Sequence, residues 1–234
     1  GPSTMALSRF TLVVLDTLGN VNAFLQGKYS TVSECWNILT SLKRHNQELS
    51  TSLLSCDPPF DFIDCLDTDK REQLASVLRQ KRQSLEQRFP CPSTSEDMRR
   101  KSRSGDKQTN TTVTFDFSKT PCSIAHLIEL NNFPQTNSIS QRVFEQLHPR
   151  LRLEIFWISA EIVSKQEQIF NCSQRRASDI SAKVGFVVEP VMTLQDVFQF
   201  VERAKYPALW NKVRELHTLM PTTVSCEQSF SVLK

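Results

Sequence analysis

Five aspartates lie within the thirteen residues from 57 to 69, and carboxylates are the ligands that hard cations such as Ca²⁺ prefer. The cluster consists of Asp57, Asp61, Asp64, Asp67 and Asp69. A helix-loop-helix calcium site also needs a glycine for its sharp turn and a glutamate at its last position. The stretch "CDPPFDFIDCLDTDK" has neither in register. We therefore predict a solvated acidic connection and no metal site, and keep cation binding as an alternative.

Cysteine and histidine could supply softer metal ligands or a nucleophile. Cys122 and His126 lie one helical turn apart, but no second pair follows at a spacing that completes a zinc site, so we interpret them as a buried thiol and a core histidine. The seven cysteines are widely spread and include no Cys-x-x-Cys pair, which indicates reduced, mostly buried thiols of an intracellular protein. The sequence has no nucleophile-elbow, P-loop, zinc-protease or dinucleotide motif, and we predict no cofactor.

Basic residues gather in two places where they could contact phosphate groups. The first set, on an expected helix, is Arg71, Arg79, Lys81 and Arg82; the second, in "MRRKSRSGDK", is Arg99, Arg100, Lys101 and Arg103. A row of such residues can follow a nucleic-acid backbone, and a basic run can also act as a nuclear address. The net charge of +3 and the pI near 8.5 are only mildly basic, so a solvated helix face and a solvated linker remain the alternatives.

The elements that position these residues are predicted to be mainly α-helical. Apolar residues recur at three- and four-residue steps over 10–27, which predicts a first helix. Thr31 and Glu34 have capping-box spacing and predict a second helix that runs to about residue 54. A third helix, amphipathic and basic, is expected over 70–89.

The middle of the chain changes character. Residues 90–112 are rich in Ser, Thr and charge and nearly free of large apolar side chains, which predicts a flexible linker. Alternation in "TVTFDF" (112–117) predicts a short strand, while "GFVVEPVM" (185–192) is either a second strand or an extended connector.

Helical spacing returns on both sides of that second segment. One helix is expected to begin at Pro149, a second is expected to be capped by Thr193 and to extend through Ala204, and a third is expected to begin at Pro207. The predicted buried positions of the helix after Pro149 are Leu151, Ile155, Ile158 and Ile162.

The expected organisation has five segments. "GPSTM" (1–5) has the look of a cloning scar, which would make the sequence a piece of a longer protein. The other segments are a helical region (6–89), a basic and polar linker (90–112), a mixed, mostly helical region (113–191) and a helical C-terminal region (192–234). No apolar run approaches the ~20 residues of a membrane span, so no membrane partner is expected.

The C-terminal region carries an aromatic and aliphatic face that could be intramolecular core or a partner surface. Tyr206, Leu209 and Trp210 begin it, and Val213 and Leu216 continue it. In the tail "PTTVSCEQSFSVLK", the spacing of serine 225 and glutamine 228 predicts a capping box, and the glutamate between them suits the positive end of a helix dipole.

Three stretches together resemble domesticated transposases of the hAT superfamily. "VLDTLGNVNAFLQGKYSTVSECWNILTSLKRHNQEL" is similar to the helical segment of that family that carries LQGK, and "LASVLRQKRQSLEQRF" is similar to the helix that follows it. "FVERAKYPALWNKVRELHTLMPTTVSCEQSFSVLK" resembles the C-terminal dimerisation region. The three stretches occur in the order expected of the family and leave residues 90–191 weakly matched.

The resemblance implies the helical insertion of an hAT transposase together with the last helices of its RNase H-like domain. Active members use two aspartates and a glutamate to bind paired divalent ions. Glu227 matches the glutamate, whereas the two aspartates would lie upstream of Phe10. One carboxylate cannot hold two metal ions, so we predict that this chain is not an enzyme and that Glu227 is vestigial.

Our leading hypothesis is a non-catalytic, transposase-derived dimerisation module of a nuclear chromatin or transcription regulator. The alternatives are a fragment of an active metal-dependent DNA transposase and a helical scaffold that binds another protein. The predicted partners are a second copy, a protein of chromatin or transcription, and nucleic acid. The predicted dimer interface is Tyr206, Leu209, Trp210, Val213, Leu216, Leu219, Phe230 and Leu233.

Overall fold

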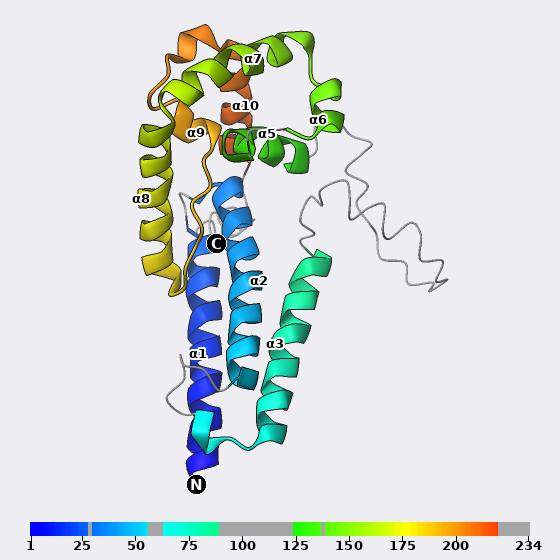
Figure 1. Cartoon of the computed structure of the whole chain (residues 1–234), viewed down its shortest axis with the longest axis vertical. Coiled ribbons are helices and arrows are strands. Elements are labelled where there is room, and N and C mark those ends of the chain that lie inside the picture. The colour runs from blue at the N-terminus through cyan, green and yellow to red at the C-terminus, as the bar shows by residue number, and fades with distance from the viewer. Residues whose placement is uncertain (28–29, 56–62, 89–123, 137–138, 220–234) are drawn as a thin grey trace, which may run out of the picture. The chain divides into compact units, whose positions relative to one another are not determined.

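The computed structural model of the chain describes residues 1–27, 30–55, 63–88, 124–136 and 139–219. The described residues form α-helices, short 3₁₀ turns and connections, and no strand occurs among them. The prediction of a mainly α-helical chain is therefore confirmed (Figure 1). The predicted linker at 90–112 and the predicted strand at 112–117 lie outside the described residues.

The chain divides into two compact units, and the division falls inside one helix, α8, between residues 174 and 175. In its described parts, the first unit consists of residues 1–27, 30–55, 63–88 and 175–190. The second consists of residues 124–136, 139–174 and 191–219.

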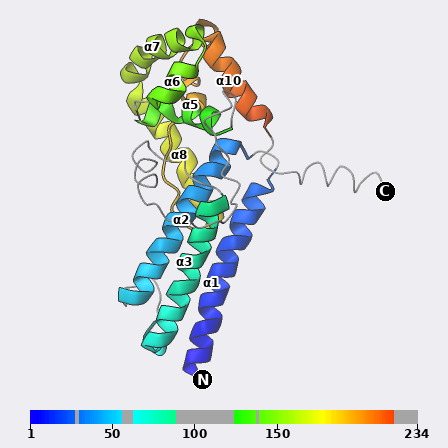
Figure 2. The same ribbon diagram turned by 90° about the vertical axis from the view of Figure 1, so that its right-hand side faces the viewer.

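The first unit is built on three long helices that lie side by side and run alternately up and down (Figures 1 and 2). They are α1 (Pro2–Leu25), α2 (Val32–Ser55) and α3 (Thr68–Arg88), with the 3₁₀ turn η1 (Ile63–Cys65) before the last. One apolar cluster joins all three helices, with Ala6, Phe10, Leu49, Leu53, Leu66, Ala75 and Leu78 buried in it. The other cluster packs α1 and α2 against the end of α8, with Val21, Ile38, Leu42, Ile180, Val184, Phe186 and Val188 buried.

Local signals in the sequence account for the helix starts of this unit. The Thr31 N–H donates to Glu34 Oε2 at 2.9 Å and the Glu34 N–H donates to Thr31 Oγ1 at 3.2 Å, so the predicted capping box is present. At the start of α3, Asp67 Oδ1 accepts the Lys70 N–H at 2.8 Å. The first helix begins at Pro2 rather than Phe10, so the expected scar at 1–5 is mostly helical here.

The second unit packs short helices around one apolar cluster (Figure 2). In chain order these are α5 (Ile124–Thr136), α6 (Gln141–Gln146), α7 (Pro149–Ser164), the first half of α8 (Gln166–Val184), α9 (Leu194–Val197), η2 (Arg203–Lys205) and α10 (Pro207–Thr218). Pro149 and Pro207 each occupy the first helical position, where the missing N–H would be unpaired in any case, as predicted. The four predicted buried positions of α7 are buried.

In the region after α7, the structure corrects one expectation and decides between two alternatives that the sequence left open. The helix capped by Thr193 has its capping box, but it ends at Val197 instead of extending through Ala204. After Val197 the backbone N–H groups of Gln199 and Phe200 donate to the carbonyl three residues earlier, which tightens the chain into 3₁₀-type turns. The Lys165 ammonium group donates to the Phe200 carbonyl. The segment 185–192 is an extended connector, the second of the two alternatives, and the Val188 N–H donates to Ser181 Oγ at 2.8 Å instead of to a strand.

Candidate protein-interaction surface

Helix α7 is apolar on two opposite faces. Its inner face carries isoleucine and leucine side chains that are at most 8% exposed, including Ile158 at 0%. Its outer face exposes Leu153 by 50%, Phe156 by 75%, Trp157 by 53% and Val163 by 70%. With the exposed Ala160, these outer residues follow helical spacing, and we call them the α7 stripe: Leu153, Phe156, Trp157, Ala160 and Val163.

Buried polar bonds attach α7 to the start of α10. The carboxylate of Glu154 is fully buried, accepts the Leu209 N–H at 2.9 Å and pairs with Arg150 Nε at 3.1 Å. It therefore satisfies one of the backbone donors that the first turn of a helix leaves unpaired. Two turns further along α7, Glu161 Oε1 accepts a hydrogen bond from the Tyr206 hydroxyl group, with 2.8 Å between the two oxygens.

These bonds fix the orientation of α7, and with it the direction in which the stripe faces. Burial raises the pKa of Tyr206 to about 12, and the hydrogen bond to Glu161 adds to the shift because ionisation would remove its donor. The large side chains of the stripe are therefore presented in a fixed direction.

The residues predicted to form a dimer interface lie mostly in the core of the second unit. Leu209 and Val213 are at most 1% exposed, and Tyr206 and Leu216 are at most 5% exposed. Of the two alternatives for this face, the structure thus places these four residues in the core. Trp210 and Leu219 are half-buried, and the remaining predicted residues, Phe230 and Leu233, lie outside the described residues.

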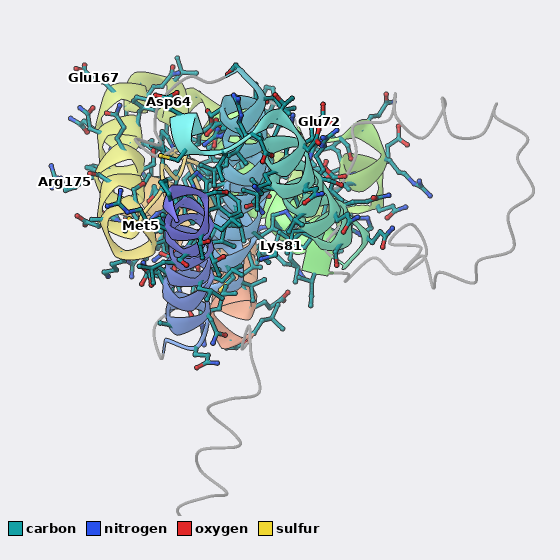
Figure 3. The ribbon with its side chains drawn as sticks, turned by 90° about the horizontal axis from the view of Figure 1, so that it is seen from below. Met5, Asp64, Glu72, Lys81, Glu167 and Arg175 are labelled. Carbon is teal, nitrogen blue, oxygen red and sulfur yellow. The ribbon has the colours of Figure 1, made fainter. Side chains whose placement is uncertain are left out.

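The basic residues predicted to contact nucleic acid are partly occupied within the chain. Arg82 bonds Gln47 of α2 and pairs with Glu86 at 2.9 Å, and Arg79 donates to the Ala75 carbonyl of its own helix. Lys81 is half-buried on α3 (Figure 3). Arg71 of this set is also half-buried on the helix, and Arg99, Arg100, Lys101 and Arg103 lie outside the described residues.

The acidic cluster has a structural role where it is described. Asp67 caps α3, and its bonds to the Lys70 side chain and backbone lower the pKa of its carboxyl. In the part of the chain that the structure covers, no three His, Cys, Asp or Glu side chains gather as a metal site would require. The vestigial candidate Glu227 lies outside that part. Among the described cysteines, burial raises the pKa of the Cys35 thiol to about 11, whereas Cys65 is exposed.

The α7 stripe is the feature that sequence reasoning missed. A signal for it exists, because "LRLEIFWISAEIV" is apolar at positions that cannot all share one helix face. The inner residues alone account for the helix, so the sequence pattern assigns no role to Phe156 and Trp157.

No family model, curated protein or solved structure matches the chain. The resemblance to hAT transposases therefore stays an expectation. Among the described helices, none combines the length and apolar character that crossing a membrane requires.

Proposed function

We propose that this chain is a non-catalytic protein-interaction module that forms a homodimer through the α7 stripe. The carrying observation is the exposure of Phe156 and Trp157, by 75% and 53%, on a helix whose other face is already core. Large contiguous apolar patches are uncommon on soluble monomers and often functional, and aromatic side chains supply much of the binding energy of interfaces.

The charges beside the stripe favour a second, antiparallel copy as the occupant. Arg150 and Glu161 are eleven residues apart, about three helical turns, so they lie along the same edge of α7. Their side chains are 60% and 30% exposed. Arg150 also pairs with Glu154 at 3.1 Å and Glu161 with Lys205 at 3.7 Å, so a second copy would share these charges with the partners inside the chain. In an antiparallel pair, Arg150 of one copy lies beside Glu161 of the other, and the midpoint falls next to Phe156.

For the wider setting, we propose a nuclear chromatin or transcription regulator derived from an hAT-superfamily transposase. The support is the resemblance of "LQGK" and of the stretch from Tyr206 onward to that family. Association through α7 takes the place of the C-terminal face that the resemblance suggested, because most described residues of that face are core.

Light scattering on a dilution series tests the proposal. We expect the full chain to have a mass near twice 26.8 kDa. The double substitution Phe156→Ser and Trp157→Ser should return it to 26.8 kDa with unchanged helix content. Val77→Ser is the matched control, because Val77 is a single exposed valine on α3 at 45% and its loss should leave the dimer intact.

Oxidative cross-linking tests the antiparallel arrangement. Phe156→Cys should form a disulfide between the two copies, because the central residue of an antiparallel pair meets its own equivalent. Val163→Cys should not, since seven residues from the centre place the two thiols roughly 20 Å apart. A chain that is monomeric at every concentration would exclude the homodimer and favour a different protein as the partner of the stripe.

A further inference from the structure

A second surface of the same unit differs in chemistry from the α7 stripe. A groove of about 410 Å³ runs between α10 and the segment that contains α9 and η2. Its lining is Gln195, Gln199, Arg203, Trp210, Arg214, His217 and Thr218. These side chains include two arginines, a histidine, an indole and two amides, and no carboxylate.

The sequence places these groups together through two elements. On α10, Trp210, Arg214 and His217 are spaced by four and three residues, and they lie beside the buried positions of that helix. The opposite wall comes from the chain that turns after Val197. The guanidinium of Arg203 stacks over the indole of Trp210 at 4.3 Å from the ring centre.

The indole itself is held in place. Phe198, which is 3% exposed, meets the Trp210 ring edge to face at 5.3 Å between centres. The groove therefore has one rigid aromatic wall, anchored in the core, with a guanidinium already stacked on it.

Two of the three carboxylates next to the groove are paired with lysines, and the third is bonded within a capping box. Glu202 pairs with Lys205 at 3.6 Å and Glu215 with Lys212 at 2.8 Å. Asp196 is buried in the capping box with Thr193. In the described part of the chain, no carboxylate forms a salt bridge with Arg203 or Arg214. The groove thus keeps a positive charge that a bound anion could neutralise.

We propose that this groove binds the phosphate of a nucleotide, either free or within a single-stranded nucleic acid. The two arginines would take the phosphate, since guanidinium groups recognise it through paired hydrogen bonds. The indole with its stacked arginine offers a platform for a base, and Gln195 and Gln199 line the same space. The Gln199 amide oxygen accepts a hydrogen bond from the Cys172 thiol at 3.3 Å, which leaves its N–H groups for the polar edge of a base. The volume suits a nucleotide, because small-ligand sites span roughly 300–1,000 Å³.

Fluorescence anisotropy with a labelled oligothymidylate, and with AMP as competitor, tests the proposal on the full chain. The double substitution Arg203→Gln and Arg214→Gln should weaken binding about tenfold or more. It should also reduce the salt dependence of the binding constant, by a log–log slope of roughly 1.4 for two lost single-strand contacts.

The matched control removes two charges from α3, with Arg79→Gln and Lys81→Gln. This control variant should change the affinity for the oligonucleotide by less than about twofold. It therefore distinguishes binding in the groove from binding to the basic face of α3. Circular dichroism and the melting temperature confirm that each variant folds.

Competition by AMP at concentrations similar to those of the oligonucleotide would identify a free nucleotide as a sufficient ligand. A bound oligonucleotide that AMP cannot displace would identify a strand. Equal losses in the two double variants, a loss only in the α3 variant, or no binding of either probe by the unaltered chain would overturn the proposal. The oligomeric state is a separate readout, so the homodimer can fail while this site stands.

Discussion

Helices α7 and α3 both lie on the surface of their units, yet their outer faces differ in kind. The outer face of α3 exposes glutamine, glutamate and arginine, and Val77 is the one exposed large apolar residue among its described side chains. The outer face of α7 exposes leucine, phenylalanine, tryptophan and valine together. Both helices bury apolar side chains on their inner face, so the fold alone does not require the apolar outer face of α7.

The difference between these two outer faces indicates on which helix a contact with a partner is to be expected. A polar outer face such as that of α3 is stable in water and gains little by being covered. Full burial of an exposed large apolar side chain contributes about 1.5–3 kcal/mol, and the large side chains of the stripe, which are 50–75% exposed, would gain the corresponding part of it. Because the stripe side chains lie outside the core, substitutions there should change association and leave the folding of the monomer unchanged.

The largest expected effect comes from the inner face of α7. Ile158→Ala should lower the free energy of unfolding by about 2–5 kcal/mol, since it leaves a cavity at a side chain with 0% exposure. Leu153→Ala on the outer face, where half of the side chain is exposed, should cost less than about 1 kcal/mol at protein concentrations where the chain is monomeric. Urea denaturation followed by tryptophan fluorescence measures both. Similar losses would mean that the two faces of α7 are equally buried in the folded monomer.

The next effect concerns the bond that attaches α7 to α10. Glu154→Ala should lower the free energy of unfolding by about 1–3 kcal/mol, because it leaves the buried Leu209 N–H without its acceptor. Glu154→Gln retains an acceptor oxygen and should cost less. A loss as large in the glutamine variant would point to the ion pair with Arg150 instead. The same urea titration distinguishes the two.

The stability of the chain at high pH should report on the hydrogen bond between Tyr206 and Glu161. The pKa of Tyr206 is raised from 10.0 to about 12, so the neutral form is favoured in the folded state. The contribution of this group is fully present below pH 10 and is lost progressively as the pH rises to about 12. Tyr206→Phe should remove this part of the pH dependence, as measured by urea midpoints across that range. If the urea midpoint of the variant falls with pH as steeply as that of the unaltered chain, the pKa of the Tyr206 hydroxyl is the same in the folded and unfolded states.

The smallest effect should come from a polar side chain of α3 that contacts α2. Arg82→Ala removes the ion pair with Glu86 and the bond to Gln47, and should lower the free energy of unfolding by at most about 1 kcal/mol. Thermal unfolding at low and high salt measures it, with a smaller difference expected at high salt because the pair is screened. A loss of several kcal/mol would mean that α3 depends on its polar face as much as α7 depends on its core.

Much of the fold could be predicted where the signals are local. The capping boxes at Thr31 and Thr193 and the proline starts of α7 and α10 are present because each depends on residues within one turn. The length of the helix after Thr193 could not be predicted in the same way. It is ended by tight backbone turns and by a lysine that comes from the end of α7.

The candidate surfaces were less accessible to sequence reasoning. Apolar spacing marked the face of α10 that begins at Tyr206 as important, but spacing does not distinguish a core from an interface. The α7 stripe and the groove at Trp210 emerge only when the exposure of each side chain is known.

The sequence by itself determined that this chain is mainly helical, where several of its helices begin and which residues of α7 are buried. Those properties follow from caps, prolines and a 3.6-residue period, all of which act within a few turns. Only the tertiary structure decided that Leu209 is core, that Phe156 is exposed and that Arg203 stacks on Trp210. These outcomes depend on which elements pack together, and residues distant along the chain compete for the same buried space.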